Sequence, residues 1–146
     1  MAFVSVTRLR IRALRFLPRF VIHTLGSRRQ CARSPGFLSG AVFAGGRRSF
    51  WTVTAWKDRE SMRAYMTDGA HRIAMPHLLE WCDEASVVHW EQSDDALPEA
   101  HEAEGRMRLE GRPSKVRHPS PDHAALRFAK LANPRMFPVR PDNRRG

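Results

Sequence analysis

Four side chains in the middle of this chain have the chemical types that a reaction at neutral pH requires. His71 and Tyr65 lie six residues apart, Trp56 precedes them and His89 follows. A histidine exchanges a proton near neutral pH or binds a metal or haem, a tyrosine offers a hydrogen bond, and an indole supplies an apolar wall. In a cavity that excludes water, such groups orient a small apolar molecule and move one of its protons.

The side chains expected around these groups are mostly apolar and recur at helical spacing. Met62 and Met66 belong to one apolar stripe. A second helical piece, residues 70–82, carries His77 and Trp81 on another broad arc. The substrate pocket is therefore predicted to be lined by Trp51, Met62, Met66, His77, Trp81 and His89.

Both helix histidines also have a purely structural explanation. His77 fits a half-buried side chain satisfied by a backbone carbonyl, and His71 fits a histidine at a helix N-terminus on a domain edge. The histidines show no paired spacing that singles out zinc, so no metal site is predicted. The sequence also contains no Walker loop, no GxGxxG and no HExxH.

Residues 49–92 position the candidate side chains and are predicted to form a strand, a helical hairpin and a second strand. Aromatic, β-branched and small residues alternate over residues 49–56, which is typical of a strand covered on both faces. Asp58 is expected to cap a helix that begins at Arg59. Pro76 is expected to bend or break the second helical piece, and residues 86–92 form the closing strand.

Preceding segments complete a β-α-β-β-α-β order. Residues 3–11 alternate as a strand, residues 14–33 carry a helical apolar stripe, and residues 36–44 form a second strand before a turn. This order predicts a ferredoxin-like α+β domain, with a four-stranded antiparallel sheet and both helices on one face. The other face would expose Trp51 or Trp56, so we expect a homodimer that buries it.

The chain divides into a ferredoxin-like domain, residues 1–93, and a C-terminal extension, residues 94–146. An acidic helix is expected over residues 94–109, followed by a segment broken by glycine and prolines. A short helix over residues 124–132 would present Leu126, Phe128 and Leu131, which suggests that this segment docks on a neighbour. Residues 133–146 are expected to be loose.

Charge is distributed unevenly along the chain, whose formal net charge is +10. Residues 1–57 hold eleven Arg or Lys and no acid, whereas residues 80–110 hold ten acids and two arginines. The two parts can neutralise each other, and no nucleic-acid motif accompanies the basic part, so a nucleic-acid partner is not expected. An arginine-rich start also suits a transit peptide, but the alternation over residues 3–11 favours a strand.

Two further features bear on location. No stretch approaches the roughly 20 apolar residues of a membrane span. Cys31 and Cys82 show no metal or redox spacing, and two free thiols favour a reducing cytoplasm.

Residues 50–75, FWTVTAWKDRESMRAYMTDGAHRIAM, carry a resemblance to a known family. A tryptophan closes the strand, a polar helix start and an aromatic or methionine stripe follow, and a small residue precedes His71. With SPGFLSG at residues 34–40, this pattern resembles the dimeric α+β barrel superfamily over roughly residues 3–92. That superfamily includes antibiotic-biosynthesis monooxygenases, spheroidene (carotenoid) monooxygenase-like proteins and haem-degrading enzymes. Residues 97–113 resemble an uncharacterised branch.

The resemblance implies a monooxygenase-like oxidoreductase that acts on an apolar or aromatic small molecule between sheet and helices. His71, Tyr65 and Trp56 are the implied catalytic residues. The cofactor is either none, with His71 as acid or base toward a substrate that itself reduces oxygen, or haem, with His71 as axial ligand. Haem-degrading members use a first-strand asparagine, which VTRL at residues 6–9 lacks. The alternative is a non-catalytic homodimer of the same fold that binds a ligand, with haem as one candidate, or that has a structural role.

Overall fold

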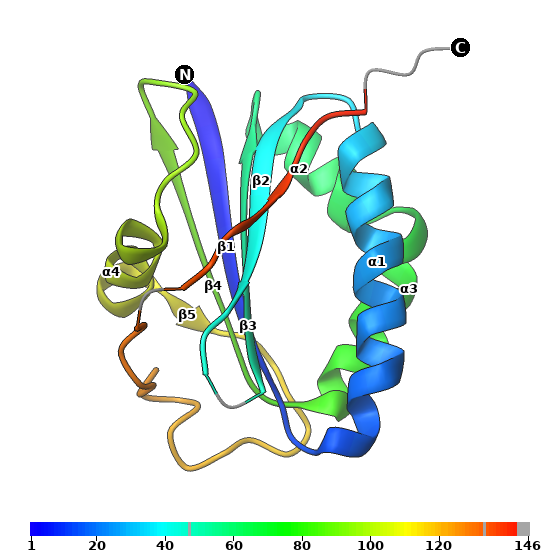
Figure 1. Ribbon diagram of the computed structural model, residues 1–146, viewed down its shortest axis with the longest axis vertical. Coiled ribbons are helices and arrows are strands. Elements are labelled where there is room, and N and C mark those ends of the chain that lie inside the picture. Colours follow the sequence, from blue (N-terminus) through cyan, green and yellow to red (C-terminus); the bar gives the residue numbers. More distant parts are fainter. Residues whose placement is uncertain (47, 133, 143–146) are drawn as a thin grey trace.

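The computed structural model describes residues 1–46, 48–132 and 134–142 of the chain (Figure 1). Its longer elements, in chain order, are β1 (Ala2–Ile11), α1 (Leu17–Arg33), β2 (Phe37–Ala44), β3 (Ser49–Trp56), α2 (Arg59–Met66), α3 (Gly69–Trp81), β4 (Cys82–Gln92) and α4 (Ala100–Glu110). A 3₁₀ turn (Leu14–Phe16) precedes α1, and two short strands follow α4, β5 (Arg112–Pro113) and β6 (Phe137–Val139).

The strands form one antiparallel sheet in the order β5-β4-β1-β3-β2-β6. The four central strands have the predicted ferredoxin-like arrangement, so the predicted fold class is confirmed. The extension adds one short strand at each edge, which the sequence did not reveal. Figure 1 shows α1, α2 and α3 on one side of the sheet and α4 on the other.

Local signals set the helix boundaries on the first side. Asp58 caps α2 as predicted, because its Oδ1 accepts the Ser61 backbone N–H at 2.8 Å. The helix α3 begins at Gly69, which has a positive φ of 53°. A bend or a break was expected at Pro76. The helix α3 continues through this residue, so the break is wrong and the bend stays a prediction.

The second face of the sheet is covered by the chain's own C-terminal extension, defined here as residues 94–132 and 134–142. Ala100, Ala103 and Met107 of α4 are buried against this face together with Leu131. Trp51 belongs to the same cluster and is 1% exposed. The predicted reason for a homodimer, an uncovered aromatic face, is therefore wrong, whereas the homodimer itself stays a prediction.

The extension differs from its predicted structure in two places. Residues 121–126 form turns and residues 127–132 have no regular structure, so the short helix predicted over residues 124–132 is wrong. Phe128 and Leu131 nevertheless dock, and they dock on the sheet of the same chain. Of the tail predicted to be loose, β6 pairs with β2, while residues 133 and 143–146 lie outside the described residues.

Candidate functional site

Hydroxyl side chains line the middle of the sheet on the side that faces α1. Ser5 pairs across the strands with Thr54, and Thr7 pairs with Thr52. They share the face of Phe3, because side chains two residues apart on a strand point to the same side. Thr7 and Thr52 are only half-buried although helices cover this face. Four hydroxyl side chains therefore lie together on the side of the sheet that faces the helices, and we call this set the hydroxyl floor.

Aromatic rings pack together beside the Ser5–Thr54 end of the hydroxyl floor. Trp56 stacks on Tyr65 with ring centroids 5.3 Å apart, and Phe37 meets Trp56 edge-on at 5.3 Å. The Trp56 indole N–H donates to Thr54 Oγ1 at 2.9 Å, which joins this wall to the hydroxyl floor. The surrounding apolar cluster also contains Met62 and Met66 from α2 and Cys31 from α1.

His71 packs against Tyr65, with the two ring centroids 4.8 Å apart and the ring planes tilted by 54°. Its Nδ1 lies 3.1 Å from the carbonyl oxygen of Met66. Because that oxygen can only accept, Nδ1 carries the proton and Nε2 keeps its lone pair. Burial lowers the pKa of His71, against the opposing effect of the Met66 carbonyl. The side chain is therefore a neutral imidazole at neutral pH, with a basic Nε2.

The junction between α2 and α3 fixes the place of His71. Gln30 of α1 donates from its side-chain amide to the carbonyl oxygens of Tyr65 and Asp68, at 3.0 and 2.7 Å. The same amide accepts the His71 backbone N–H at 2.8 Å. The Gln30 side chain thus fixes the positions of Tyr65 and His71 relative to α1.

A second imidazole, His89, faces the helices from β4. It pairs across strands with Ser5, and its ring centroid lies 5.4 Å from that of Phe3. Its Nε2 is buried and has no hydrogen-bond partner among the described residues. Burial lowers its pKa, and nearby arginines, first among them Arg112, lower it further. His89 is a second neutral base on the same side of the sheet.

The two other titratable groups of this cluster stay protonated. Burial raises the pKa of the Tyr65 phenol, whose hydroxyl donates to the Ser27 carbonyl oxygen at 3.2 Å. Burial also raises the pKa of the Cys31 thiol to about 12. A thiol attacks only as its thiolate, so Cys31 is a packing residue rather than a nucleophile.

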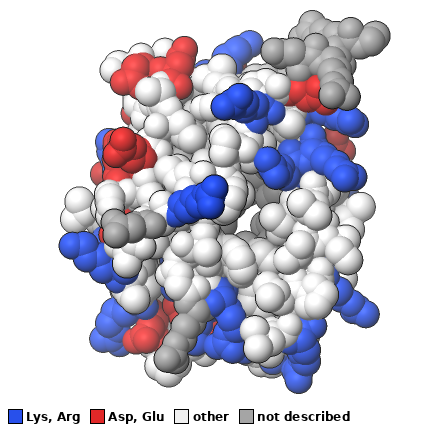
Figure 2. Space-filling model, in the orientation of Figure 1, with Lys and Arg blue, Asp and Glu red and all other residues white. Residues whose placement is uncertain are grey.

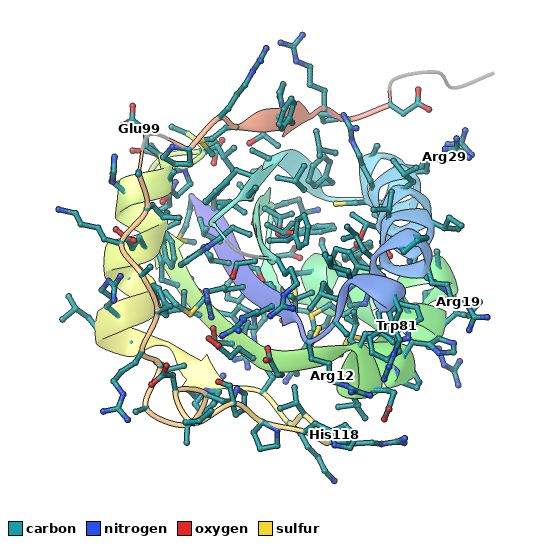
Figure 3. All side chains as sticks on the ribbon, turned by 60° about the horizontal axis from the view of Figure 1, so that its bottom comes forward. Arg12, Arg19, Arg29, Trp81, Glu99 and His118 are labelled. Carbon is teal, nitrogen blue, oxygen red and sulfur yellow. The ribbon has the colours of Figure 1, made fainter. Side chains whose placement is uncertain are left out.

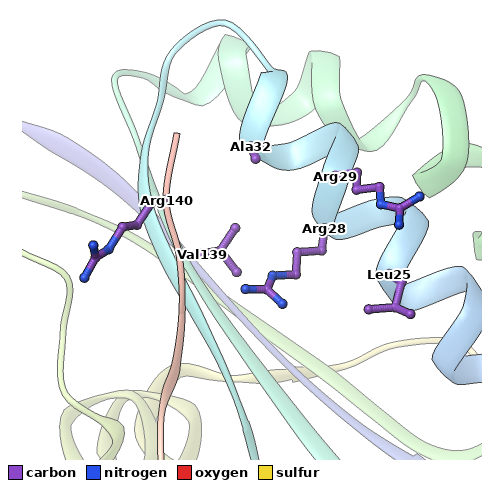
Figure 4. A pocket seen from close by; sticks show the side chains of 6 residues that line it. All are labelled: Leu25, Arg28, Arg29, Ala32, Val139 and Arg140. Atoms are coloured by element: carbon purple, nitrogen blue, oxygen red, sulfur yellow. The ribbon is translucent and has the colours of Figure 1, made fainter. Parts of the chain in front are cut away.

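A pocket of about 330 Å³ opens between α1 and β6. It is lined by Leu25, Arg28, Arg29, Ala32, Val139 and Arg140. Figure 4 shows Arg28 reaching from α1 toward Val139, whereas Arg29 and Arg140 point outward. Ala32 and Val139 also belong to the apolar cluster of Trp56 and Tyr65, so the pocket adjoins the aromatic wall. Figure 2 shows a hollow on this face with Lys and Arg beside it.

Two predicted pocket residues lie elsewhere between the helices. His77 stacks on Trp81 with ring centroids 5.0 Å apart, and each of these two centroids lies 5.3 Å from the centroid of the His23 ring. These three side chains line a separate pocket of about 300 Å³ with Arg19 and Ile22. Figure 3 shows Arg19 and Trp81 together on the α1–α3 side of the molecule. The half-buried position expected for His77 is wrong, because this residue is exposed.

Trp51 is the predicted pocket residue that the structure places on the wrong side of the sheet. Its ring stacks on Phe43 at 5.7 Å and meets Phe128 of the C-terminal extension at 5.5 Å. Neighbouring residues of a strand point to opposite faces, so Trp51 and Trp56 of one strand cannot both line one pocket. The prediction for Trp51 as a pocket residue is therefore wrong.

Sequence reasoning missed the hydroxyl floor formed by Ser5, Thr7, Thr52 and Thr54. A signal was present, because two strands that pair in the sheet both carry hydroxyl residues two positions apart. A polar pair on the covered face of a strand interrupts the apolar pattern expected there. The signal becomes specific only when the register places Ser5 opposite Thr54 and Thr7 opposite Thr52.

The described residues bear on a metal site and on a haem site in different ways. Within residues 1–46, 48–132 and 134–142, no three His, Cys, Asp or Glu side chains gather closely enough to hold a metal ion. The His71 ring packs on Tyr65, and His71 lines neither of the two pockets. An axial ligand needs open space beside it for a macrocycle, which neither of these two pockets supplies at His71, and haem stays a prediction.

The fold defines the class of protein to which this chain is similar. The chain is similar to the solved structure of a conserved protein from Methanosarcina mazei Go1, with a TM-score of 0.58 and 14% identity, over 64% of this chain and 94% of that chain. A mutant of SnoaB, a cofactor-independent oxygenase from Streptomyces nogalater, has a TM-score of 0.54 and 16% identity, over 67% of this chain and 98% of that chain. An antibiotic biosynthesis monooxygenase has a TM-score of 0.56 and 12% identity, over 63% of this chain and 99% of that chain.

Residues 20–133 match the family described as a domain of unknown function (DUF3291), and the chain belongs to that family. No curated protein matches. The resemblance to the dimeric α+β barrel superfamily is confirmed at the level of the fold. In the described part of the chain, none of the helices is long and apolar enough to cross a membrane.

Proposed function

We propose that the chain is a monooxygenase-like oxidoreductase that oxidises a small apolar or aromatic molecule with molecular oxygen and without a bound cofactor. The observation that carries the proposal is the state of His71, a neutral imidazole with its proton on Nδ1 and a basic Nε2. It stands at the end of an aromatic wall with Trp56 and Tyr65, the three residues predicted as catalytic. The fold shared with a cofactor-independent oxygenase supports the same reaction class.

The substrate approaches through the pocket between α1 and β6. Its apolar body contacts Ala32 and Val139, which lead to the aromatic wall. Val139 pairs with Gly40, and Gly40 pairs with Thr54, so the hydroxyl floor begins two strands from the pocket. Hydroxyl groups on that floor can donate hydrogen bonds to a carbonyl or phenol oxygen of the substrate.

The reaction that fits these groups begins with proton removal. The basic Nε2 of His71 takes a proton from an acidic C–H of the substrate, and the resulting carbanion passes its electrons to oxygen. For a substrate methylene, one oxygen molecule yields a carbonyl group and one water, so the substrate itself is the reductant. A general base with a pKa at or below neutral pH is present in its active form throughout this step.

An oxygen-uptake assay tests the proposal. The probe is an anthrone, because its methylene lies between two aromatic rings and is acidic. Wild-type protein is expected to accelerate oxygen uptake, and His71→Gln to reduce the rate about 100-fold, the order of a general-base contribution. His101→Gln is the matched control, because His101 is exposed on α4. Equal rates for wild type and His71→Gln would refute the role of His71.

A second candidate is a ligand-binding protein of the same fold that performs no chemistry. The favouring observation is that neither pocket is lined by His71, so ligand could bind beside Val139 without reaching a base. Saturable quenching of tryptophan fluorescence by the anthrone, with no oxygen uptake above the uncatalysed rate, would establish this candidate instead.

The cellular location belongs to the same proposal. Cys31 and Cys82 are both free and buried, and free thiols persist in a reducing compartment. The cytoplasm is the compartment that suits them. Cell fractionation with a tagged chain tests this, and recovery from an oxidising compartment would contradict it.

A further inference from the structure

We propose that the C-terminal extension is a built-in partner for the sheet, which takes in cis the place of a second copy, so that the chain is a monomer in solution. The inference is independent of the proposed chemistry, because it concerns the face of the sheet opposite the candidate site. It replaces the homodimer expected from the sequence.

Apolar packing between the extension and the sheet is complete. Met107 and Ala103 of α4 are both 0% exposed, and Leu131 is 4% exposed. They cover a sheet surface made of Val4, Val6, Phe43, Trp51, Val53, Val88 and Trp90. Each of these sheet side chains is buried, so the aromatic surface that favoured pairing with another copy is already removed from water.

Polar contacts join α4 to residues 127–132 over this surface. We call this set of contacts, made by Glu104, Arg108, Phe128 and Leu131, the lock. The buried Glu104 of α4 accepts the Leu131 backbone N–H at 2.7 Å and lies 3.4 Å from the Arg108 guanidinium. Arg108 also donates to the Phe128 carbonyl oxygen at 3.1 Å. The Phe128 ring has guanidinium carbons of Arg8 and Arg108 4.6 and 4.1 Å from its centroid. Arg8 is itself a sheet residue, so the lock reaches the sheet.

The segment between β4 and α4 favours packing of α4 on the sheet of its own chain over packing on the sheet of a second chain. The strand β4 ends at Gln92 and α4 begins at Ala100. The Gln92 side-chain amide donates to the carbonyl oxygens of Asp94 and Ala96, at 3.2 and 2.6 Å, which shapes a tight return. Arg106 then stacks over Trp90, on the strand that the chain has just left, at 4.8 Å. A short, hydrogen-bonded return places α4 on its own strand.

Dimensions exclude a second sheet from the same place. Two sheets in direct contact pack about 10 Å apart. An α-helix with its side chains is about 10–12 Å across, so α4 fills the layer that a second sheet would need. The solved structures of similar fold are covered over 94–99% of their length, whereas they match only 63–67% of this chain. About a third of this chain therefore has no counterpart in these structures, a share close to that of the extension.

Light scattering coupled to size-exclusion chromatography tests the proposal on the full chain. The expected mass is that of one chain, 16.7 kDa, and it stays constant over about a hundredfold range of concentration. A mass of twice that value would overturn the proposal. The result is separate from the proposed function, because it does not depend on oxygen uptake.

A pair of variants on α4 tests whether the extension is what keeps the chain single. Met107→Asp places a charge at a fully buried position and is expected to raise the fluorescence of an apolar dye several-fold and to cause concentration-dependent association. Leu109→Asp is the control, because Leu109 is 86% exposed on the same helix. Should Met107→Asp fail to fold, Phe128→Ala loosens the lock without a buried charge. Identical mass and dye response in wild type, Phe128→Ala and Leu109→Asp would overturn the proposal.

Discussion

Replacement of Glu104 by alanine is expected to destabilise the chain well beyond an ordinary surface substitution. Glu104 is 5% exposed, and it accepts the buried Leu131 N–H at 2.7 Å. Loss of a hydrogen bond to a charged group costs about 1.5–3 kcal/mol, and a buried N–H left without a partner adds to this. The expected decrease in the free energy of unfolding is therefore about 2–4 kcal/mol.

Urea denaturation followed by tryptophan fluorescence measures this change, since Trp51 and Trp90 lie under the extension. A loss of this size in a chain of this length lowers Tm by roughly 5–15 °C. Glu102→Ala is the control, because Glu102 is exposed on the same helix. Glu104→Gln keeps an acceptor and should lose less than Glu104→Ala. Should Glu104→Ala stay within about 0.5 kcal/mol of Glu102→Ala, the reasoning about the lock is refuted.

Four further predictions concern stability and the site. The pKa values of His71 and His89 are lowered in the folded state, so the unfolded chain binds more protons below about pH 6.5. Urea titrations should therefore show that the free energy of unfolding falls as pH decreases from about 6.5, and that it falls less in a variant with both histidines replaced by glutamine. Gly36→Ala should lower the free energy of unfolding by about 1–3 kcal/mol in thermal unfolding, because the Gly36 φ is +84° and the added Cβ meets the Ser61 side chain. Gly46→Ala is the control and should lower it less, because φ is +106° but the added Cβ meets nothing. Gln30→Ala should cost about 1–3 kcal/mol in urea titrations and slow oxygen uptake, since it removes the contacts that hold the α2–α3 junction. Haemin titration should give no saturable Soret band that depends on His71, and a stoichiometric band lost in His71→Ala would show that haem does fit.

The central fold was predictable because its strands and caps carry local signals. Alternation over residues 49–56 identified β3, and Asp58 identified the start of α2. The segment that follows α4 was not predictable in the same way. Phe128 and Leu131 are three residues apart, as on one face of a helix, but Leu126 adopts a positive φ of 53° and Phe128 packs between two arginines. Tertiary contacts there override the local pattern.

The candidate site was predictable in part. Trp56, Tyr65 and His71 do lie together, because the strand end, α2 and the start of α3 follow one another in the chain. Trp51 was misplaced because alternation shows that a strand has two covered faces and does not show what covers each. The hydroxyl floor depends on register between strands far apart in the sequence, which periodicity within a single strand does not reveal.

The cover provided by the C-terminal extension changes which substitutions the sheet can accept. In a symmetric pair, every substitution at the interface appears twice and must be compatible with its own copy. Here Met107 and Trp51 are two different positions of one chain in the same buried cluster, so a change on one side of the cluster can be compensated on the other. Burial within one chain also obeys no mass action, so the sheet is covered equally well in a dilute and in a concentrated solution.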